Sequence, residues 1–376
     1  MKKIILISIS LIFVVGGTLA IAENILKKRA GEKPAEKQWI TEIADDDGWV
    51  GIDSSIAVDT SGNPHISHFD AKNKDLKYAY LKDDVWVRER VDSAGHLGEE
   101  SGIGVDSKGN VHISYNDITN GTLKYAKKAG GSWSIETVDK KSQSHVTITS
   151  LALDAEENPH IAYIMESTSQ YGDAVKYASW DGSSWKIEEA AQGGSDLYLA
   201  LDSSDNPHIA FLKGSQGNKK IYYTRKISGT WKTEVVDLST VAEGDCGIDT
   251  DSKNYPHITY HDYSKAAIKY AKWDGISWQI QTVAVNVGKQ EGLRLATDSQ
   301  DNPHLVYVDV KKEKLVHAFF DQKSWTKEII SKMGIPSIAI DSLNRVHVSH
   351  GSVADKETID PETGEEIEIL KYSVRI

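Results

Sequence analysis

Disulfide bonds within the chain are excluded, because Cys246 is the only cysteine among 376 residues. The fold must therefore rely on packing rather than on disulfides. Cys246 is interpreted as a small buried side chain near an inner strand, with a reactive thiol as the alternative. Arginine is also scarce, with seven in the whole chain, which disfavours a sialidase-like clamp of arginines on an anionic sugar.

Clusters of positive charge are lacking as well. The formal net charge is −12, and the lysines are scattered through the predicted strands and turns. A nucleic-acid binder would show a basic face, so this class of partner is excluded. The sequence also has no glycine-rich phosphate loop, zinc signature or serine-nucleophile motif.

One long apolar run is present, at the N-terminus. Lys2 and Lys3 precede an uncharged apolar segment over residues 4–22, which ends in the small-x-small sequence Ala20-Ile21-Ala22. This pattern predicts a signal peptide, or alternatively an uncleaved membrane anchor. The protein is therefore expected to be secreted, periplasmic or on the cell surface. The predicted organisation is a signal peptide or anchor over 1–22, a polar linker over 23–37 and one folded domain over 38–376.

An internal repeat dominates the rest of the chain. A Pro-His or Val-His step recurs seven times with a period near 48 residues, at His65, His112, His160, His208, His257, His304 and His347. A repeat of this length with four short strands predicts a blade array, because one blade cannot bury its faces without neighbours.

The first unit illustrates the four strands. Residues 55–59 alternate as a strand, 60–63 form a Gly/Asn turn, and 64–70 return antiparallel. Residues 76–81 and 85–91 supply the third and fourth strands. In the second strand, one face carries large side chains and the other carries His and a small residue, which suits sheets that stack around an axis.

The two ends of the chain predict a closed ring. The fourth strand of each unit contains a Trp, at Trp39, Trp86, Trp133, Trp185, Trp231, Trp278 and Trp325. The first precedes any His motif, and the last unit stops after its third strand at Leu370-Lys371-Tyr372. Residues 39–44 should therefore complete the seventh blade, and the fold class is an all-β, seven-bladed propeller of four-stranded antiparallel blades.

The units resemble those of known β-propeller families. Ile56-Ala57-Val58-Asp59 with Ser61-Gly62-Asn63, and also Ile338-Ala339-Ile340-Asp341, are similar to NHL-type repeats. Residues 180–185 and 273–278 (Trp-Asp-Gly-x-Ser-Trp) resemble BNR repeats, although their Asp and Gly are adjacent rather than separated by one residue. The resemblance implies the architecture and not the activity, because propellers host many functions.

The repeated histidines are interpreted as structural, because a residue at the same place in every blade answers a packing demand common to every blade. The same interpretation applies to the repeated Trp. The alternative is a multivalent lectin with one sugar site at each blade junction.

Departures from the repeat are better evidence for a site. The loops that enter the first strands share one face of a propeller, and they carry many acidic residues. The candidates for this mouth are Asp53, Glu100, Asp196, Asp245 and Asp249. Asp249 replaces a small residue in a slot that faces inward. A cation such as Ca²⁺ at Asp53, Glu100 and Asp245 is one hypothesis, and a solvated acidic rim is the other.

Five histidines lie outside the repeated position and near the same face: His68, His96, His145, His261 and His350. An arc of such residues on neighbouring blades would suit a metal or a general base. His68 and His350, however, occupy a slot that is Tyr in other units, which also fits a place in the core.

These features give one leading function and two alternatives. The leading interpretation is an exported, non-catalytic binding or scaffold propeller that engages a glycan or a protein through its loop face. The first alternative is a polysaccharide lyase or hydrolase of the cell envelope that uses the histidine arc with Asp70 or Asp262. The second is the multivalent lectin. A membrane would be contacted only through an uncleaved N-terminal segment.

Overall fold

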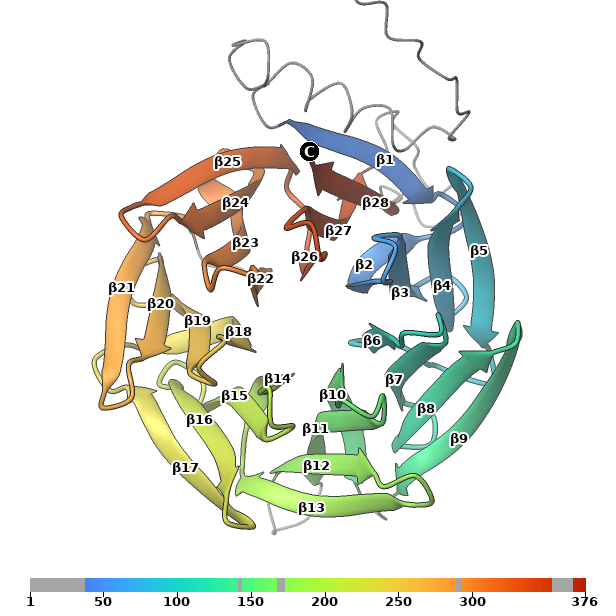
Figure 1. Ribbon diagram of the computed structural model, residues 1–376, viewed down its shortest axis with the longest axis horizontal. Helices are drawn as coiled ribbons and strands as arrows, with labels where there is room; N and C mark the ends of the chain where they lie inside the picture. Colours follow the sequence, from blue (N-terminus) through green and yellow to red (C-terminus); the bar gives the residue numbers. More distant parts are fainter. Residues whose placement is uncertain (1–37, 141–143, 168–172, 289–291, 354–367) are drawn as a thin grey trace, which may run out of the picture. The chain divides into compact units, whose positions relative to one another are not determined.

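The protein is a seven-bladed β-propeller, as the sequence predicts (Figure 1). The computed structural model describes residues 38–376 except 141–143, 168–172, 289–291 and 354–367. The leader and linker predicted over 1–37 lie outside the described residues. Within the described part, 28 strands form seven four-stranded antiparallel sheets, and Trp39–Arg375 is one compact unit. None of the helices in that part is long and apolar enough to span a membrane.

Each blade runs from the central channel outward in the order of its strands. The first four blades are β2 (Val50–Val58), β3 (Pro64–Asp70), β4 (Asp75–Lys82) and β5 (Val85–Asp92); β6 (Gly102–Val105), β7 (Val111–Asp117), β8 (Thr122–Ala129) and β9 (Ser132–Lys140); β10 (Ser144–Leu153), β11 (Pro159–Ser167), β12 (Ala174–Trp180) and β13 (Trp185–Gln192); and β14 (Ser195–Leu201), β15 (Pro207–Lys213), β16 (Lys220–Ile227) and β17 (Thr230–Asp237).

The remaining blades follow the same plan until the last. They are β18 (Ala242–Thr250), β19 (Pro256–Asp262), β20 (Ala267–Trp273) and β21 (Trp278–Val285); β22 (Leu293–Thr297), β23 (Pro303–Asp309), β24 (Lys314–Phe320) and β25 (Trp325–Lys332), with the short 3-10 helix η1 (Val310–Lys312); and β26 (Pro336–Ile340), β27 (Val346–Val353), β28 (Glu368–Arg375) and β1 (Trp39–Asp45).

Ring closure by the N-terminal strand is confirmed. The strand β1 pairs antiparallel with β28, and Trp39 lies opposite Arg375 (Figure 1). At the other end of β1, the carboxylate of Asp45 is fully buried and contacts Lys77 Nζ at 2.6 Å and His68 Nε2 at 2.9 Å in blade 1. Burial opposes ionisation of Asp45, but these two partners hold its pKa well below the ordinary value. Blade 7 is thus held to blade 1 by a buried charged cluster.

The repeated His joins two parts of its own blade. In blade 2, Asp106 ends the first strand and accepts hydrogen bonds from the backbone of Lys108 and Asn110 in the following turn. The wholly buried His112 places Nε2 at 3.5 Å from Asp106 Oδ2 and Nδ1 at 2.6 Å from the hydroxyl of Tyr125. All seven repeated histidines are buried, so each has a structural position.

The repeated Trp joins each blade to the preceding one. Trp133 Nε1 donates to Glu89 Oε2 at 2.9 Å, and its ring packs edge-on against Tyr78. The same bond runs from Trp86 to Glu42 and, across the last junction, from Trp39 to Glu328 at 3.3 Å. The Trp-x-x-Glu pattern therefore encodes contacts between neighbouring blades.

Blade 6 is expected to make stability depend on pH. His304 faces His317 instead of a Tyr, with Nδ1 and Nε2 2.9 Å apart, and burial together with His317 lowers the pKa of His304 to about 4. The unfolded chain therefore takes up the proton first as pH falls from about 6.5. The stability that the neutral His304 contributes is complete above that pH and is lost on acidification toward pH 4.

Replacing His317→Tyr removes the neighbouring imidazole that disfavours the charged form of His304. We expect the loss of unfolding free energy between about pH 7.5 and about pH 5 to shrink by about 1 kcal/mol in the variant. Urea denaturation at the two pH values measures this. An equal loss in both proteins would contradict the assignment.

Candidate functional site

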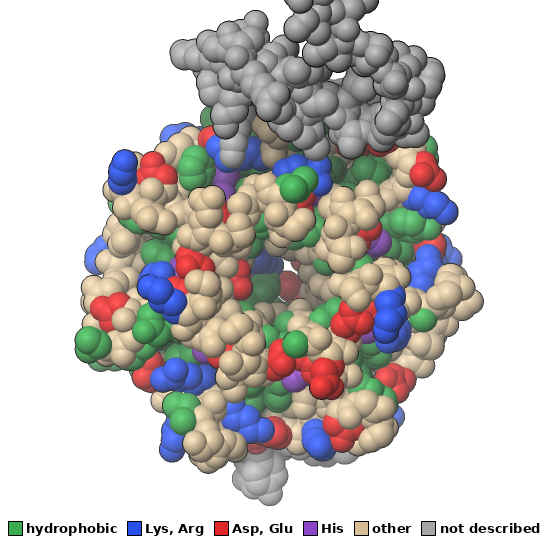
Figure 2. Space-filling model, viewed as in Figure 1, with side chains coloured by type: hydrophobic (Ala, Val, Ile, Leu, Met, Phe, Trp, Pro, Cys, Tyr) green, Lys and Arg blue, Asp and Glu red, His purple; other side chains and the backbone are tan. Residues whose placement is uncertain are grey.

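A cavity of about 170 Å³ lies within the ring, lined by residues of the inner strands of the blades and of the loops that enter them. In the space-filling view the ring has an opening at its centre, with acidic side chains at several places around it (Figure 2). The cavity lining combines carboxylates, hydroxyls, one Tyr and one Arg: Asp53, Ser55, Glu100, Thr149, Ser150, Tyr198, Arg294 and Ser337 are among its residues.

The register of the repeat explains this lining. Each inner strand is followed by an Asp that caps the first turn. The residues four positions before it are Ser55, Gly102, Ser150, Tyr198, Gly247, Arg294 and Ser337. The residues six positions before it are Asp53, Glu100, Ile148, Asp196, Asp245, Gly292 and Ile335. The residues four positions before the Asp form a first layer, in which the side chains are small except at blades 4 and 6. The residues six positions before it form a second, acidic layer, with Asp or Glu at blades 1, 2, 4 and 5.

Arg294 is held in place by an ion pair and an aromatic ring. Its Nη1 lies 2.8 Å from Asp245 Oδ2, which also accepts hydrogen bonds from the backbone N–H groups of Gly292 and Leu293. The guanidinium carbon lies 4.4 Å from the centre of the Tyr198 ring, a cation–π contact. Burial lowers the pKa of Arg294, but the charge of Asp245 outweighs this and raises it above its ordinary value.

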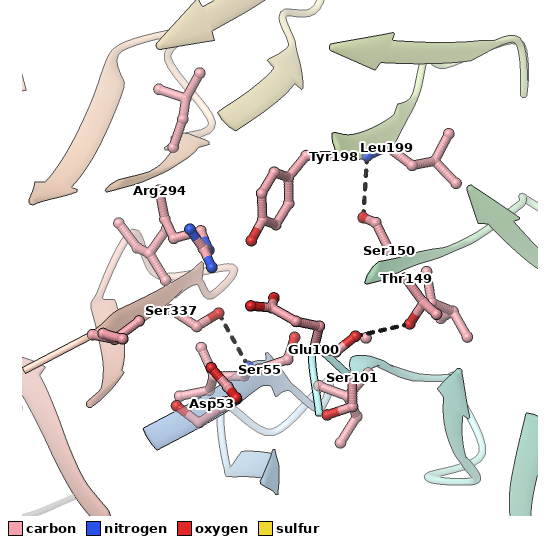
Figure 3. A pocket seen from close by; sticks show the side chains of 18 of the residues that line it. Asp53, Ser55, Glu100, Ser101, Thr149, Ser150, Tyr198, Leu199, Arg294 and Ser337 are labelled. Carbon is pink, nitrogen blue, oxygen red and sulfur yellow. Dashed lines mark hydrogen bonds between the residues drawn. The ribbon is translucent and has the colours of Figure 1, made fainter. Parts of the chain in front are cut away.

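Glu100 is directed into the cavity. Figure 3 shows its carboxylate pointing toward the guanidinium of Arg294 and the hydroxyl of Tyr198. Its backbone has a φ of 50°, in the left-handed region that disfavours side chains other than glycine. Burial, and then the nearby charge of Asp53, raise the pKa of Glu100 well above its ordinary value. A carboxyl that keeps its proton can both donate and accept hydrogen bonds.

Asp196 lies at the same level on blade 4 and has the same backbone conformation, with a φ of 50°. Its carboxylate is 3.5 Å from Lys219 Nζ, and burial raises its pKa. The thiol of Cys246 is fully buried and donates to the carbonyl of Asp196 at 2.8 Å. The cysteine therefore has a structural position, in which its thiol holds the backbone of Asp196.

The carboxylate of Asp249 is occupied by hydrogen bonds from neighbouring residues. Its Oδ2 accepts hydrogen bonds from the backbone and the hydroxyl of Thr297, both at 2.7 Å, and its Oδ1 accepts one from the backbone of Thr250. Burial raises its pKa. Asp249 is not among the residues that line the cavity and instead joins blade 5 to blade 6.

The five additional histidines are not brought together in the cavity. His68 is bonded to Asp45, and His350 to the carbonyl of Gly351 at 3.1 Å and to Ser373 at 3.0 Å. His96 and His145 pair with Glu99 and Glu166 at 2.7 and 2.9 Å. His261 is buried and packs edge-on against Tyr263.

Asp70 and Asp262, the carboxylates predicted to act with the histidines, cap turns. Asp70 accepts hydrogen bonds from the backbone of Lys72 and Asn73, and Asp262 from the hydroxyl of Ser264. Among the described residues, no group of three or more His, Cys, Asp or Glu side chains is placed to hold a metal ion. Of the three proposed calcium ligands, Asp245 is paired with Arg294.

Tyr198 and Arg294 line the cavity but are not among the site residues predicted from the sequence. The small number of arginines in the chain conceals the register of Arg294 in the repeat. The signal was present, because in the layer four residues before the capping Asp the other five blades have Ser or Gly. A large side chain in that layer must project into the channel.

Comparisons with known proteins identify the fold. No protein-family model and no curated protein matches the sequence. Among solved structures, the chain is similar to the polysaccharide lyase Uly1, with a TM-score of 0.57 and 8% identity over 94% of this chain and 95% of that one. It is also similar to a protein of unknown function from Dyadobacter fermentans, with a TM-score of 0.55 and 10% identity over 90% and 97% of the two chains.

A third similar structure is the GH93 α-L-arabinofuranosidase of Fusarium graminearum in complex with arabinobiose, with a TM-score of 0.51 and 10% identity over 90% of this chain and 97% of that one. Likeness at these identities establishes the shared propeller fold. The NHL-type and BNR-type resemblances of the repeat are not supported by any family model.

Proposed function

We propose that the protein is a glycan-binding propeller and that the cavity containing Glu100, Tyr198 and Arg294 binds a sugar residue. The observation that carries this proposal is the convergence on one cavity of an aromatic ring and a guanidinium, from a layer that is otherwise small, with carboxylates from the acidic layer. Aromatic rings stack on the apolar faces of sugars, and charged groups form strong hydrogen bonds with hydroxyls. The cavity volume of about 170 Å³ suits a single sugar residue better than a segment of another protein.

The comparisons support the ligand class at the level of the fold. Two of the similar propellers act on polysaccharides or arabinosides, and one of them was solved with arabinobiose. The predicted leader favours binding outside the cytoplasm, either secreted or at the cell surface. The central cavity is shared by the blades rather than repeated at each junction, which favours one site for its ligand over the multivalent lectin, and the stoichiometry of binding of that ligand distinguishes the two.

Replacing Glu100→Ala should weaken binding of the tightest ligand from a glycan panel by about 10- to 100-fold, because hydrogen bonds to a charged or strongly polar group are lost. Isothermal titration calorimetry measures this. Glu99→Ala is the matched control, since Glu99 is adjacent, pairs with His96 and does not line the cavity. Equal losses in the two variants, or no binding of any glycan by the unmodified protein, would reject the proposal.

A second candidate is hydrolysis of a glycosidic bond at the same cavity. Two carboxyl groups in the same cavity favour it: Asp53 and Glu100 both line the cavity, and burial together with the charge of Asp53 raises the pKa of Glu100. Glycosidases use one protonated carboxyl as an acid and a second carboxylate as a base or nucleophile. Release of reducing ends from a polysaccharide, abolished in a Glu100→Gln variant that still binds, would identify the enzyme. Glycan binding without release of reducing ends would reject hydrolysis and support the non-catalytic binding function.

A further inference from the structure

Two related grooves lie at blade junctions, at the opposite ends of the strands from the cavity. Each combines the third strand of one blade with the first turn of the next and with a Trp from the third strand of that next blade. The blade 2–3 groove adds the fourth strand of its first blade, and the blade 4–5 groove adds the first turn of its own. The groove between blades 2 and 3 contains Trp180 and has a volume of about 420 Å³. The groove between blades 4 and 5 contains Trp273 and has a volume of about 540 Å³.

The two grooves differ in charge. The blade 4–5 groove contains Arg225, Lys226 and Lys253. The blade 2–3 groove has a single lysine, Lys127, together with Glu136 and Glu157. Arg225 and Lys127 occupy the same position of the repeat, because each lies opposite the repeated His of its own blade, His208 or His112. The blade 4–5 groove is therefore a basic version of a shared site, in a chain whose net charge is −12.

Two of the three cations are available to a ligand. Lys226 pairs with Glu188, but no ion pair with a described carboxylate involves Arg225 or Lys253. One carboxylate, Asp202, also lines the groove. It is buried and accepts hydrogen bonds from Asn206 and from His208, which reduces its effect on a ligand.

The aromatic side of the groove is closely packed. The Trp273 ring lies 5.5 Å from the Trp278 ring at an angle of 67°, and Trp278 donates to Glu234 at 2.9 Å. The turn after Trp273 is closely packed, because a Cβ at Gly275 would lie 2.8 Å from the hydroxyl of Tyr255. An indole fixed next to two cations combines a stacking surface for a sugar ring with partners for an anionic group.

We propose that the groove between blades 4 and 5 is a second saccharide site, which binds an acidic sugar residue bearing a carboxylate or a sulfate. The ring of the sugar stacks on Trp273, and the anionic group contacts Arg225 and Lys253. A nucleic acid fits less well, because a phosphate chain requires a continuous basic surface and the remainder of the protein is acidic. This site is independent of the central cavity.

The test uses the full chain, with an oligogalacturonate tetrasaccharide and a chondroitin sulfate tetrasaccharide as acidic probes and a neutral galactan tetrasaccharide for comparison. At least one acidic probe should bind more tightly than the neutral one, and its affinity should fall as salt is added. Lys253→Glu should weaken that binding by about 10-fold or more. Lys253 is exposed, so this variant is expected to fold, and its melting temperature verifies that.

Matched controls locate the site. Trp273→Ala should weaken binding of the acidic probe, whereas Trp180→Ala in the other groove should leave it unchanged. Failure of both acidic probes to bind, or equal losses with Trp180→Ala, would overturn the proposal. Inorganic sulfate that binds as tightly as the sulfated probe, or a single-stranded oligonucleotide that binds more tightly, would also overturn it.

Discussion

A chain that begins at residue 46, without β1, is expected to lose cooperative folding or to aggregate. Its blade 7 would have three strands, and the backbone groups of β28 that pair with β1 would be exposed as an open edge. The same deletion removes Asp45, the buried carboxylate partner of Lys77 at 2.6 Å, and leaves only the exposed carboxylate of Asp47 at 3.9 Å. Loss of one partner of a buried pair alone costs about 3 to 5 kcal/mol, and the lost strand adds to this.

Thermal unfolding followed by circular dichroism, together with size-exclusion chromatography, measures the outcome. A chain that begins at residue 38 is the control, because it keeps the whole of β1 and should unfold like the full chain. Equal melting temperatures for the two truncated chains would show that the ring does not depend on β1.

The second large effect is expected at the ion pair beside the cavity. Replacing Arg294→Met should lower the free energy of unfolding by about 3 to 5 kcal/mol, because the buried carboxylate of Asp245 loses its only ion-pair partner among the described residues. The same variant should lose saccharide binding. Urea denaturation gives the stability, and titration calorimetry gives the affinity.

A double-mutant cycle separates the pair from the individual side chains. Asp245→Asn combined with Arg294→Met should cost less than the sum of the two single changes, because neither charge is then left buried alone. Arg90→Met is the control: Arg90 is about half exposed and bonded to Asp75 at 2.8 Å, so its loss should cost about 1 kcal/mol or less. Additive losses at Asp245 and Arg294 would contradict the coupling.

The fold could be predicted from the sequence because each blade repeats its packing contacts. The strand alternation, the Asp-capped turn and the Trp-x-x-Glu strand recur with a nearly constant period, so seven copies reinforce one interpretation. Closure was readable because Trp39 has no preceding His motif and the last unit lacks a Trp strand. These features can be recognised in a single sequence, because each involves residues close together in the chain or recurs at a nearly fixed spacing.

The candidate site was only partly readable. Asp53 and Glu100 stand out as acidic residues at the start of inner strands, and both line the cavity. The partners of His68 and Asp249 could not be predicted in the same way, because Asp45 and Thr297 belong to neighbouring blades and occur once, without a repeat to reveal them. An isolated polar residue in a repeat has two physical explanations, a ligand or a partner across the junction, and only coordinates distinguish them.

The pairing of β1 with β28 also sets the order of events during synthesis. The first strand of the propeller to leave the ribosome must wait for the last, Glu368–Arg375, before its backbone groups find their partners. At about 5 to 20 residues per second, that wait lasts roughly 16 to 66 seconds. The backbone groups of β1, and the side chain of Ala44 that is fully buried in the closed ring, remain uncovered for this time. An incomplete chain, whether from a nonsense mutation or a stalled ribosome, therefore cannot close the ring and presents the unpaired edge that chaperones and proteases recognise.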